Sequence, residues 1–137
     1  GIWKGKLILK GIQEADDAIA ATEVGADGLV VSNHGARQLD SVHSSIVKLP
    51  GVVAAVGERM EVYVDGGVRS GLDVFKAVAL GARGVMIGRP WAWALAAGGE
   101  AAIADLLATF KKELEVAMAL SGVTTIGQIL PDQIDST

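Results

Sequence analysis

The chain has 137 residues and a mass of 14.1 kDa, enough for one ordinary domain, and half of its residues are hydrophobic, which excludes a disordered or collagen-like chain. Twelve basic and sixteen acidic residues are dispersed along it and give a net charge of −4, so no basic face is expected to bind nucleic acid. The chain has no cysteine for disulfides or thiolate metal sites, and no apolar run reaches the roughly 20 residues that span a bilayer. We therefore expect one unit over residues 1–137 in a cytoplasmic setting, with peripheral attachment to a membrane left open.

The first half of the chain alternates two short apolar runs with two stretches of helical period. Leu and Ile dominate Lys6–Lys10, which we predict as a buried strand of a parallel sheet that ends at the next glycine. Residues 14–25 follow as a helix, with acids in the first turn and a glycine at the end. The next strand is predicted over 28–32, and the next helix over 44–57, where Pro50 should break or restart it.

The second half of the chain continues the alternation. Strands are predicted over 61–65 and 84–88, separated by a helix over 71–81. Pro90 is suited to the first turn of a short helix after the last strand. The final helix is predicted over 100–121. Its apolar face consists of Ile103, Leu106, Leu107, Phe110, Leu114 and Ala117.

An internal repeat supports four strand–helix units. GADGLVVSN (25–33) and GARGVMIGR (81–89) share a Gly-Ala pair that ends a helix and a second glycine that opens a strand. Alternating units with apolar strands indicate an α/β fold with a parallel sheet, either open or closed into a barrel. The polar residues of interest follow the predicted strand ends, which is where (β/α)8 barrels place their sites. Because such a barrel needs about 250 residues, the chain is expected to supply half of one.

Two glycine clusters follow the last two predicted strands. DGGVRSG (65–71) would let backbone N–H groups approach an anion at a helix start, and Arg69 would add charge. GRP (88–90) repeats this arrangement one unit later. Either cluster alone is typical of a tight turn. Together they match the phosphate site that barrels commonly build after strands seven and eight.

Five motifs make the chain similar to a known family. LILKG, VSNHGARQLD, DGGVRSGLDVFKAVALGA, GRP and MALSG resemble, in order and spacing, the C-terminal half of the FMN-dependent 2-hydroxy-acid oxidase and dehydrogenase family. This family includes glycolate oxidase, flavin L-lactate dehydrogenase and mandelate dehydrogenase. The likeness covers nearly the whole chain, and SNHGARQLD is its specific element, because other flavin or phosphate barrels share the GGVR element but not the His–Arg pair. It implies strands 5–8, with their helices, of a TIM (β/α)8 barrel.

The resemblance also implies roles for individual residues. His34 would be the active-site base, Arg37 would bind the substrate carboxylate, and Lys10 would lie against N1 and O2 of the flavin. Further FMN contacts from this chain would come from Ser32, Asp65, Gly66, Gly67, Val68, Arg69, Gly88 and Arg89. The implied reaction oxidises an (S)-2-hydroxy acid such as glycolate or lactate to the 2-oxo acid, with a hydride or its equivalent passing to flavin N5.

These residue types suit that chemistry independently of the resemblance. Histidine titrates near neutral pH and can take a proton from the substrate. A guanidinium offers a carboxylate two parallel hydrogen bonds, and a fixed ammonium stabilises negative charge that develops on a reduced flavin. Outside the motif, however, His34 would be an ordinary loop histidine, and Arg37 and Lys10 would be ordinary ion-pair residues.

Other interpretations remain open at this point. The chain could be an inactive half-barrel that binds phosphate or flavin as an assembly module, or part of another flavin barrel enzyme. The first and last strands would be unpaired edges, so we expect the N-terminal half of the barrel or self-association to cover them, a homo-oligomer, and an isolated chain without activity. His43 is expected on the surface, and Trp91 and Trp93 in packing or an interface. No metal-ligand spacing is present in the sequence, so we predict no metal.

Overall fold

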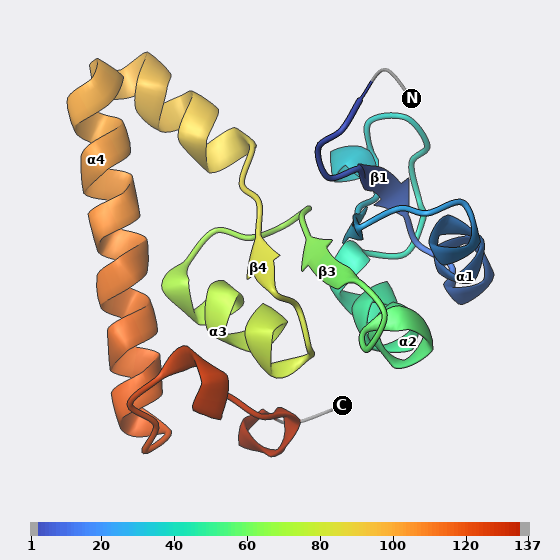
Figure 1. Cartoon of the computed structure of the whole chain (residues 1–137). Coiled ribbons are helices and arrows are strands. Elements are labelled where there is room, and N and C mark those ends of the chain that lie inside the picture. The colour runs from blue at the N-terminus through green and yellow to red at the C-terminus, as the bar shows by residue number, and fades with distance from the viewer. Residues whose placement is uncertain (1–2, 135–137) are drawn as a thin grey trace.

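The protein, described here by a computed structural model over residues 3–134, is an α/β structure built on one four-stranded sheet (Figure 1). All neighbouring strands are parallel and lie in chain order. The strands are β1 (Ile8–Ile12), β2 (Gly28–Val31), β3 (Glu61–Val64) and β4 (Gly84–Val85). The helices are α1 (Ala15–Glu23), α2 (Ser45–Val56), α3 (Gly71–Ala79) and α4 (Arg89–Leu120). Short 3-10 turns cover His34–Ala36, Ile126–Gln128 and Pro131–Gln133.

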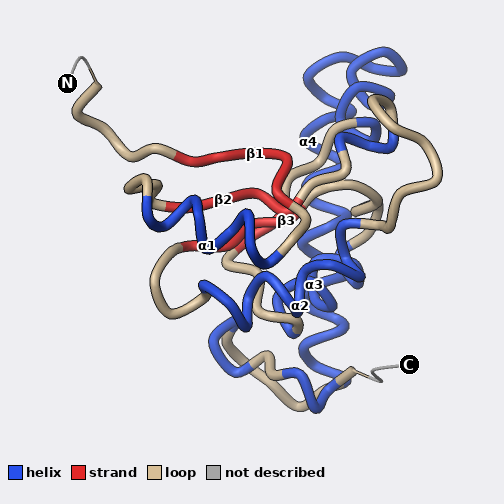
Figure 2. The backbone as a smooth tube through the Cα atoms, turned by 90° about the vertical axis from the view of Figure 1, so that its right-hand side faces the viewer, coloured by secondary structure: helices blue, strands red, loops and turns tan. Residues whose placement is uncertain are grey.

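The core lies between the sheet and α1, α2 and α3, which cover one face of it (Figure 2). Successive strand residues point to opposite faces, so Leu29 and Val31 of β2 lie buried in this core. The in-register neighbours Lys10 and Tyr63 flank Val30 and belong to the other face. No helix within the described residues covers that second face. The sheet therefore has one covered face and one open face.

The internal repeat predicted from the sequence is present in the structure. Gly25 ends α1 with a φ of 82° and Gly81 ends α3 with a φ of 95°, a left-handed conformation that glycine adopts without a steric cost. In both places the following alanine donates its backbone N–H to a helix carbonyl, at 3.1 and 3.0 Å. The second glycine of each copy, Gly28 or Gly84, then opens a strand.

The first and last strands differ from their predicted bounds. β1 begins and ends two residues later than predicted. Its end is later because Gly11, with a φ of 104°, forms an irregularity instead of ending the strand. The pairing then resumes between Ile12 and Val31. β4 is only two residues long, although the N–H of Met86 still donates to the Val64 carbonyl at 2.9 Å. Lys10 therefore lies within a strand and not at its end.

Pro50 does not break or restart α2, contrary to the prediction. The helix is continuous from Ser45 to Val56. Proline removes one N–H donor from the helix, but the flanking Leu49 and Val52 are fully buried against the sheet. Pro50 itself faces outward, so tertiary packing of the buried side holds the helix together across it.

The predicted short helix at Pro90 and the final helix are the two arms of α4, which turn sharply against each other (Figure 1). The bend falls at Gly98 and Gly99, which have non-helical backbone angles. Phe110 packs onto α3, whereas Leu107, which the pattern placed on the same face, is 53% exposed. By length and composition alone α4 could cross a membrane, but the bend at Gly98 and Gly99 divides it into two arms.

Candidate functional site

A cavity of about 440 Å³ lies at the carboxyl ends of the strands. Its lining contains the predicted base, the predicted carboxylate-binding arginine and both glycine clusters. The lining residues are Lys10, His34, Gly35, Arg37 and residues 65–69 and 86–93. Every predicted site residue except Ser32 is therefore part of one cavity wall, and Ser32 lies just behind it, 2% exposed.

A larger hollow of about 780 Å³ lies at the opposite end of the sheet. Both acidic and basic side chains line it, including Glu58, Arg59 and Arg83. Its walls also include Ile126 and Ile129 from the C-terminal segment. No predicted site residue lines it, and parallel α/β proteins bind ligands at the carboxyl ends of their strands, so we place the functional site in the smaller cavity.

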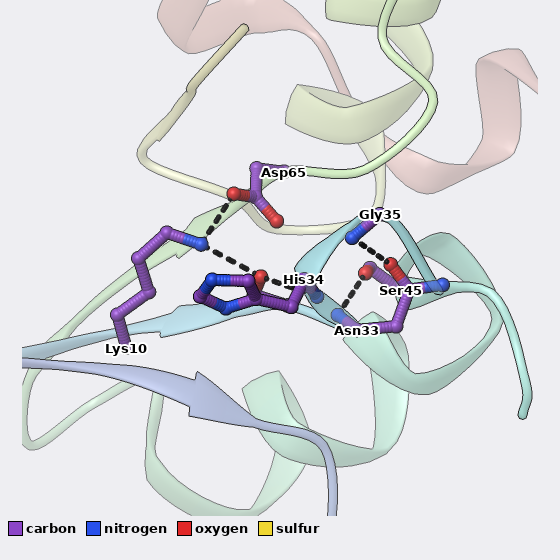
Figure 3. Close-up of polar contacts among 7 residues, drawn as sticks. Lys10, Asn33, His34, Gly35, Ser45 and Asp65 are labelled. Atoms are coloured by element: carbon purple, nitrogen blue, oxygen red, sulfur yellow. Dashed lines mark hydrogen bonds and ion pairs between the residues drawn. The ribbon is translucent and has the colours of Figure 1, made fainter. Parts of the chain in front are cut away.

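Lys10 is held in place by two oxygens from two different elements (Figure 3). Its ammonium nitrogen lies 2.8 Å from the Ser32 hydroxyl oxygen and 2.5 Å from Asp65 Oδ2. The second carboxylate oxygen, Asp65 Oδ1, is buried and has no hydrogen-bond partner among the described residues. An unpaired buried acceptor of this kind is costly, and it is available to a donor from a ligand.

The turn that carries the predicted base has an unusual backbone. His34, Gly35 and Ala36 all have positive φ angles, of 56°, 68° and 57°. Only glycine adopts this region freely, and other residues pay roughly 1–2 kcal/mol each. The N–H of His34 donates to the Ser32 hydroxyl at 3.1 Å. In Figure 3 the His34 ring extends toward the Lys10 amino group. Strain at such a position is typical of functional sites.

Sequence reasoning missed two residues that support this turn. The Asn33 side-chain oxygen accepts the N–H of Gly35, and the Ser45 hydroxyl accepts the N–H of Asn33, both at 3.0 Å. The signal for Asn33 was present, because asparagine often bonds the backbone two residues onward in a turn. Ser45 gave no such signal: it stands at the start of α2 and reads as a helix cap, and only the fold brings it to the turn.

The two glycine loops leave open space in the cavity wall. A side-chain carbon built at Gly67 or Gly88 would meet no atom within 4 Å. Gly67 has a φ of 103°, and Gly88 directly precedes α4. Arg69 belongs to the first of these loops and Arg89 is the first residue of α4, and both are exposed residues that line the cavity. This combination of cations and accessible backbone at a helix start suits a phosphate group.

The remaining predicted residues are less constrained. Arg37 follows the strained turn, lines the cavity and is exposed. Trp91 and Trp93 are 45% and 66% exposed and line the cavity, so they are not packed within the described residues, and the interface role predicted as the alternative stays a prediction. His43 is exposed, as predicted. Within residues 3–134 no cluster of three metal-ligating side chains is found.

Comparison with known proteins gives consistent matches. The sequence profile described as "FMN-dependent dehydrogenase" matches residues 1–136. An L-lactate dehydrogenase from Caulobacter vibrioides (strain NA1000 / CB15N) is 58% identical over 127 residues, which are 93% of this chain and 33% of that protein. An L-lactate dehydrogenase from Pseudomonas putida (strain W619) is 51% identical over 132 residues, 96% of this chain and 35% of that protein.

Solved structures agree with these sequence matches. A mandelate oxidase variant with a monooxide FMN adduct superposes with a TM-score of 0.90 at 47% identity, over 94% of this chain and 41% of that one. A flavocytochrome b2 variant with pyruvate bound superposes with a TM-score of 0.92 at 40% identity, over 97% of this chain and 35% of that one.

The chain thus spans about a third of the length of the curated relatives it matches. The predicted fold class is confirmed, since the solved neighbours are TIM-barrel flavoenzymes and this chain matches part of their barrel with its parallel strands in chain order. The chain belongs to the FMN-dependent dehydrogenase family.

Proposed function

We propose that this chain supplies the C-terminal half of a barrel that uses FMN to oxidise a 2-hydroxy acid to the 2-oxo acid. The observation that carries the proposal is the convergence of His34, Arg37, Lys10 and both glycine loops on one cavity. Relatives named for L-lactate and mandelate support the substrate class. FMN as the cofactor is supported by the family and by the FMN adduct in a solved neighbour.

The described residues fit FMN. The cavity volume of about 440 Å³ lies within the range of roughly 300–1,000 Å³ that small-molecule sites occupy. Arg69 and Arg89 would hold the phosphate beside the open glycine positions. The unpartnered Asp65 Oδ1 would accept a hydrogen bond from a hydroxyl of the ribityl chain. Lys10 and Ser32 would lie at the polar edge of the ring system.

Each polar group would then have a distinct role. When bound, the flavin supplies the acceptor for the two electrons of the oxidation, taken up as a hydride or its equivalent. A ring nitrogen of His34 would take the proton of the substrate hydroxyl group. The guanidinium of Arg37 would bind the substrate carboxylate through two parallel hydrogen bonds and so fix its orientation. The ammonium of Lys10 would favour negative charge nearby, tempered by its ion pair with Asp65.

The rest of the site would come from outside this chain. The edges of the sheet at β1 and β4 are open, and the face that carries Lys10 and Tyr63 is uncovered by the described residues. We propose that the other half of the barrel closes both edges and supplies the remaining pocket walls. Residues of that other half would largely determine which 2-hydroxy acid is oxidised and which electron acceptor is used. Assembly of the complete barrel as a homo-oligomer and a cytoplasmic location remain predictions.

A chimeric enzyme tests the function. The 127 matching residues of the Caulobacter vibrioides L-lactate dehydrogenase are replaced by those of this chain, and the protein is loaded with FMN. We expect anaerobic L-lactate to bleach the flavin absorbance. His34→Gln should slow bleaching by about 10²- to 10⁴-fold, because the glutamine cannot accept the proton. The matched control His43→Gln changes the exposed histidine and should leave the rate unaltered.

Two outcomes would contradict the proposal. A chimera that binds FMN but is bleached by no 2-hydroxy acid would show that these residues do not support the reaction. Bleaching at a normal rate with His34→Gln would remove the base assignment while leaving cofactor binding in place.

A further inference from the structure

The backbone of the His34–Ala36 turn is not selected by its own sequence. Two of its three residues carry a side chain, yet all three have φ angles between 56° and 68°. Left-handed stretches of this kind are rare for L-residues other than glycine. Contacts from outside the turn must therefore hold it, and the direction of the His34 side chain depends on those contacts.

The Ser32 hydroxyl accepts the N–H of His34 at 3.1 Å, and two further side chains contact the turn by consecutive hydrogen bonds. The Asn33 Oδ1 atom accepts the N–H of Gly35 at 3.0 Å, inside the turn. The N–H of Asn33 in turn donates to the Ser45 hydroxyl at 3.0 Å. Ser45 is fully buried at the first position of α2, so this second bond ties the turn to a packed helix. Figure 3 shows Asn33 and Ser45 on the opposite side of the His34 backbone from its ring.

The loop after β3 fits closely against the same pair. A side-chain carbon at Gly66 would lie 2.9 Å from Asn33 Oδ1 and 3.0 Å from the Ser45 hydroxyl oxygen. Both distances are shorter than normal contacts, and Gly66 also has a φ of 85°. The glycine therefore leaves room for the two hydrogen bonds, and the loop and the turn meet at this pair.

Ser45 is not an ordinary helix cap. The N-cap of α2 is Ser44, whose side chain makes no capping hydrogen bond. The Ser45 hydroxyl is instead directed to the backbone of Asn33, twelve residues earlier. Ser44 is exposed, whereas Ser45 is buried. The two neighbouring serines therefore differ: one hydroxyl lies at the surface, and the other has a specific partner.

We propose that Asn33 and Ser45 are positioning residues that clamp the His34–Ala36 turn in its left-handed conformation and thereby aim His34 into the cavity. The role assigned to His34 rests on the proposed function. The clamp itself rests only on the two hydrogen bonds, the buried hydroxyl and the close approach of Gly66.

The test measures flavin reduction at saturating L-lactate in the FMN-loaded chimera described above. Asn33→Ala and Ser45→Ala should each slow reduction by about 10- to 100-fold, the loss typical of a catalytic group misplaced by about 1 Å. Asn33→Asp keeps the acceptor oxygen and should restore most of the rate. Ser44→Ala is the matched control and should not change it. The dissociation constant of FMN should stay within about threefold throughout.

A double-mutant cycle separates positioning from general destabilisation. In a His34→Gln background, Asn33→Ala and Ser45→Ala should each lower the rate of flavin reduction by less than about twofold, because the histidine that Asn33 and Ser45 position is already absent. If Asn33→Ala or Ser45→Ala lowered the rate by the same factor with His34 and with His34→Gln, the proposal would be overturned. Normal rates in the two single variants would also overturn it.

If the chimera with native residues does not reduce its flavin, the proposed function fails, and amide hydrogen exchange on the 137-residue chain decides the clamp. Asn33→Ala should accelerate exchange at the Gly35 N–H, and Ser45→Ala at the Asn33 N–H, while Ser44→Ala should do neither. Unchanged exchange rates in the first two variants would show that these hydrogen bonds do not hold the turn.

Discussion

Ser32 joins the two parts of the site through one buried hydroxyl. Its oxygen accepts two hydrogen bonds, one from the Lys10 ammonium at 2.8 Å and one from the backbone N–H of His34 at 3.1 Å. The lysine assigned to the flavin and the backbone of the assigned base therefore share one acceptor, which is 2% exposed. Charge-assisted bonds of this type are stronger than neutral ones, so a change at Lys10 is expected to be transmitted to the turn.

At the residue scale, Arg37→Lys tests the carboxylate contact. Lysine keeps the charge but loses the planar pair of donors. In the chimera we expect KM to rise and kcat/KM to fall for every 2-hydroxy acid, with FMN affinity unchanged, as measured by steady-state kinetics and flavin titration. A change confined to FMN affinity would assign Arg37 to the cofactor instead.

The pKa of Tyr63 can be measured directly, because Tyr63 is the only tyrosine of the chain. Its hydroxyl donates to Glu61 Oε2 at 2.8 Å, and this hydrogen bond, with partial desolvation and the glutamate charge, raises the tyrosine pKa above its ordinary value near 10. The hydrogen-bonded neutral phenol therefore stabilises the folded state below about pH 10. Its contribution to the free energy of unfolding is lost as the pH rises through the raised pKa.

Glu61→Gln should lower the pKa of Tyr63 toward 10, since the charged acceptor is removed. Phenolate absorbance during an alkaline titration of this chain measures it. A variant that titrates at the same pH as the native chain would show that Glu61 does not control Tyr63.

The sequence predicted the site residues unevenly, for a physical reason. His34 and Arg37 belong to one contiguous motif, so a local pattern was enough to predict a role for them. The ion pair of Lys10 with Asp65 and the contact of Ser45 with the turn join residues from separate elements. Those contacts depend on strand register and helix packing, which no local pattern specifies.

At the scale of elements, α3 and α4 meet at a glycine. A side-chain carbon at Gly71 would clash with the Phe110 carbonyl oxygen and the Leu114 backbone nitrogen. The Gly71 N–H also donates to Glu113 Oε2 at 2.6 Å. Backbone atoms cannot move aside as a side chain can, so the first turn of α3 requires glycine for this close packing.

Gly71→Ala should therefore lower the free energy of unfolding by about 1–3 kcal/mol, the usual cost of overpacking. Gly51→Ala is the matched comparison, because Gly51 lies inside α2 with no atom within 4 Å of the added carbon. There alanine should stabilise by about 0.5–1 kcal/mol through helix propensity alone. Urea denaturation of the chimera measures both, and a neutral Gly71→Ala would refute the packing argument.

The elements themselves were predicted where local signals agree with packing. The repeated glycines placed the ends of α1 and α3 and the starts of β2 and β4. Predictions failed where packing outweighed a local signal: α2 continues through Pro50, and β1 continues through Gly11. Separate helices were predicted before and after Gly98 and Gly99, but the direction of one arm of α4 relative to the other was not, because two glycines within an apolar stretch do not reveal it.

At the scale of the whole molecule, the sheet has two open edges. β1 and β4 each have a strand neighbour on one side only, and Ile8 and Met86 are 46% and 45% exposed there. Unpaired edges of this kind favour association. We expect the 137-residue chain alone to self-associate, to bind FMN weakly and not to oxidise glycolate, lactate or mandelate.

Size-exclusion chromatography with light scattering, FMN titration and substrate-driven bleaching measure these three properties. Addition of the N-terminal part of a homologous barrel should restore FMN binding and turnover together, because it would close both edges and complete the pocket. A monomer that binds FMN tightly and turns over substrate would contradict the argument.

The distribution of charge around the cavity has a kinetic consequence. Among the described residues, four cationic side chains line it, those of Lys10, Arg37, Arg69 and Arg89, against the single carboxylate of Asp65, in a chain whose net charge is −4. We therefore expect an approaching anion to be repelled by most of the surface and attracted to this cavity, which would raise its rate of capture. Since the Debye length is about 8 Å at physiological ionic strength, this steering acts only over the last stage of approach, and added salt should slow the capture of carboxylates and phosphates more than their release.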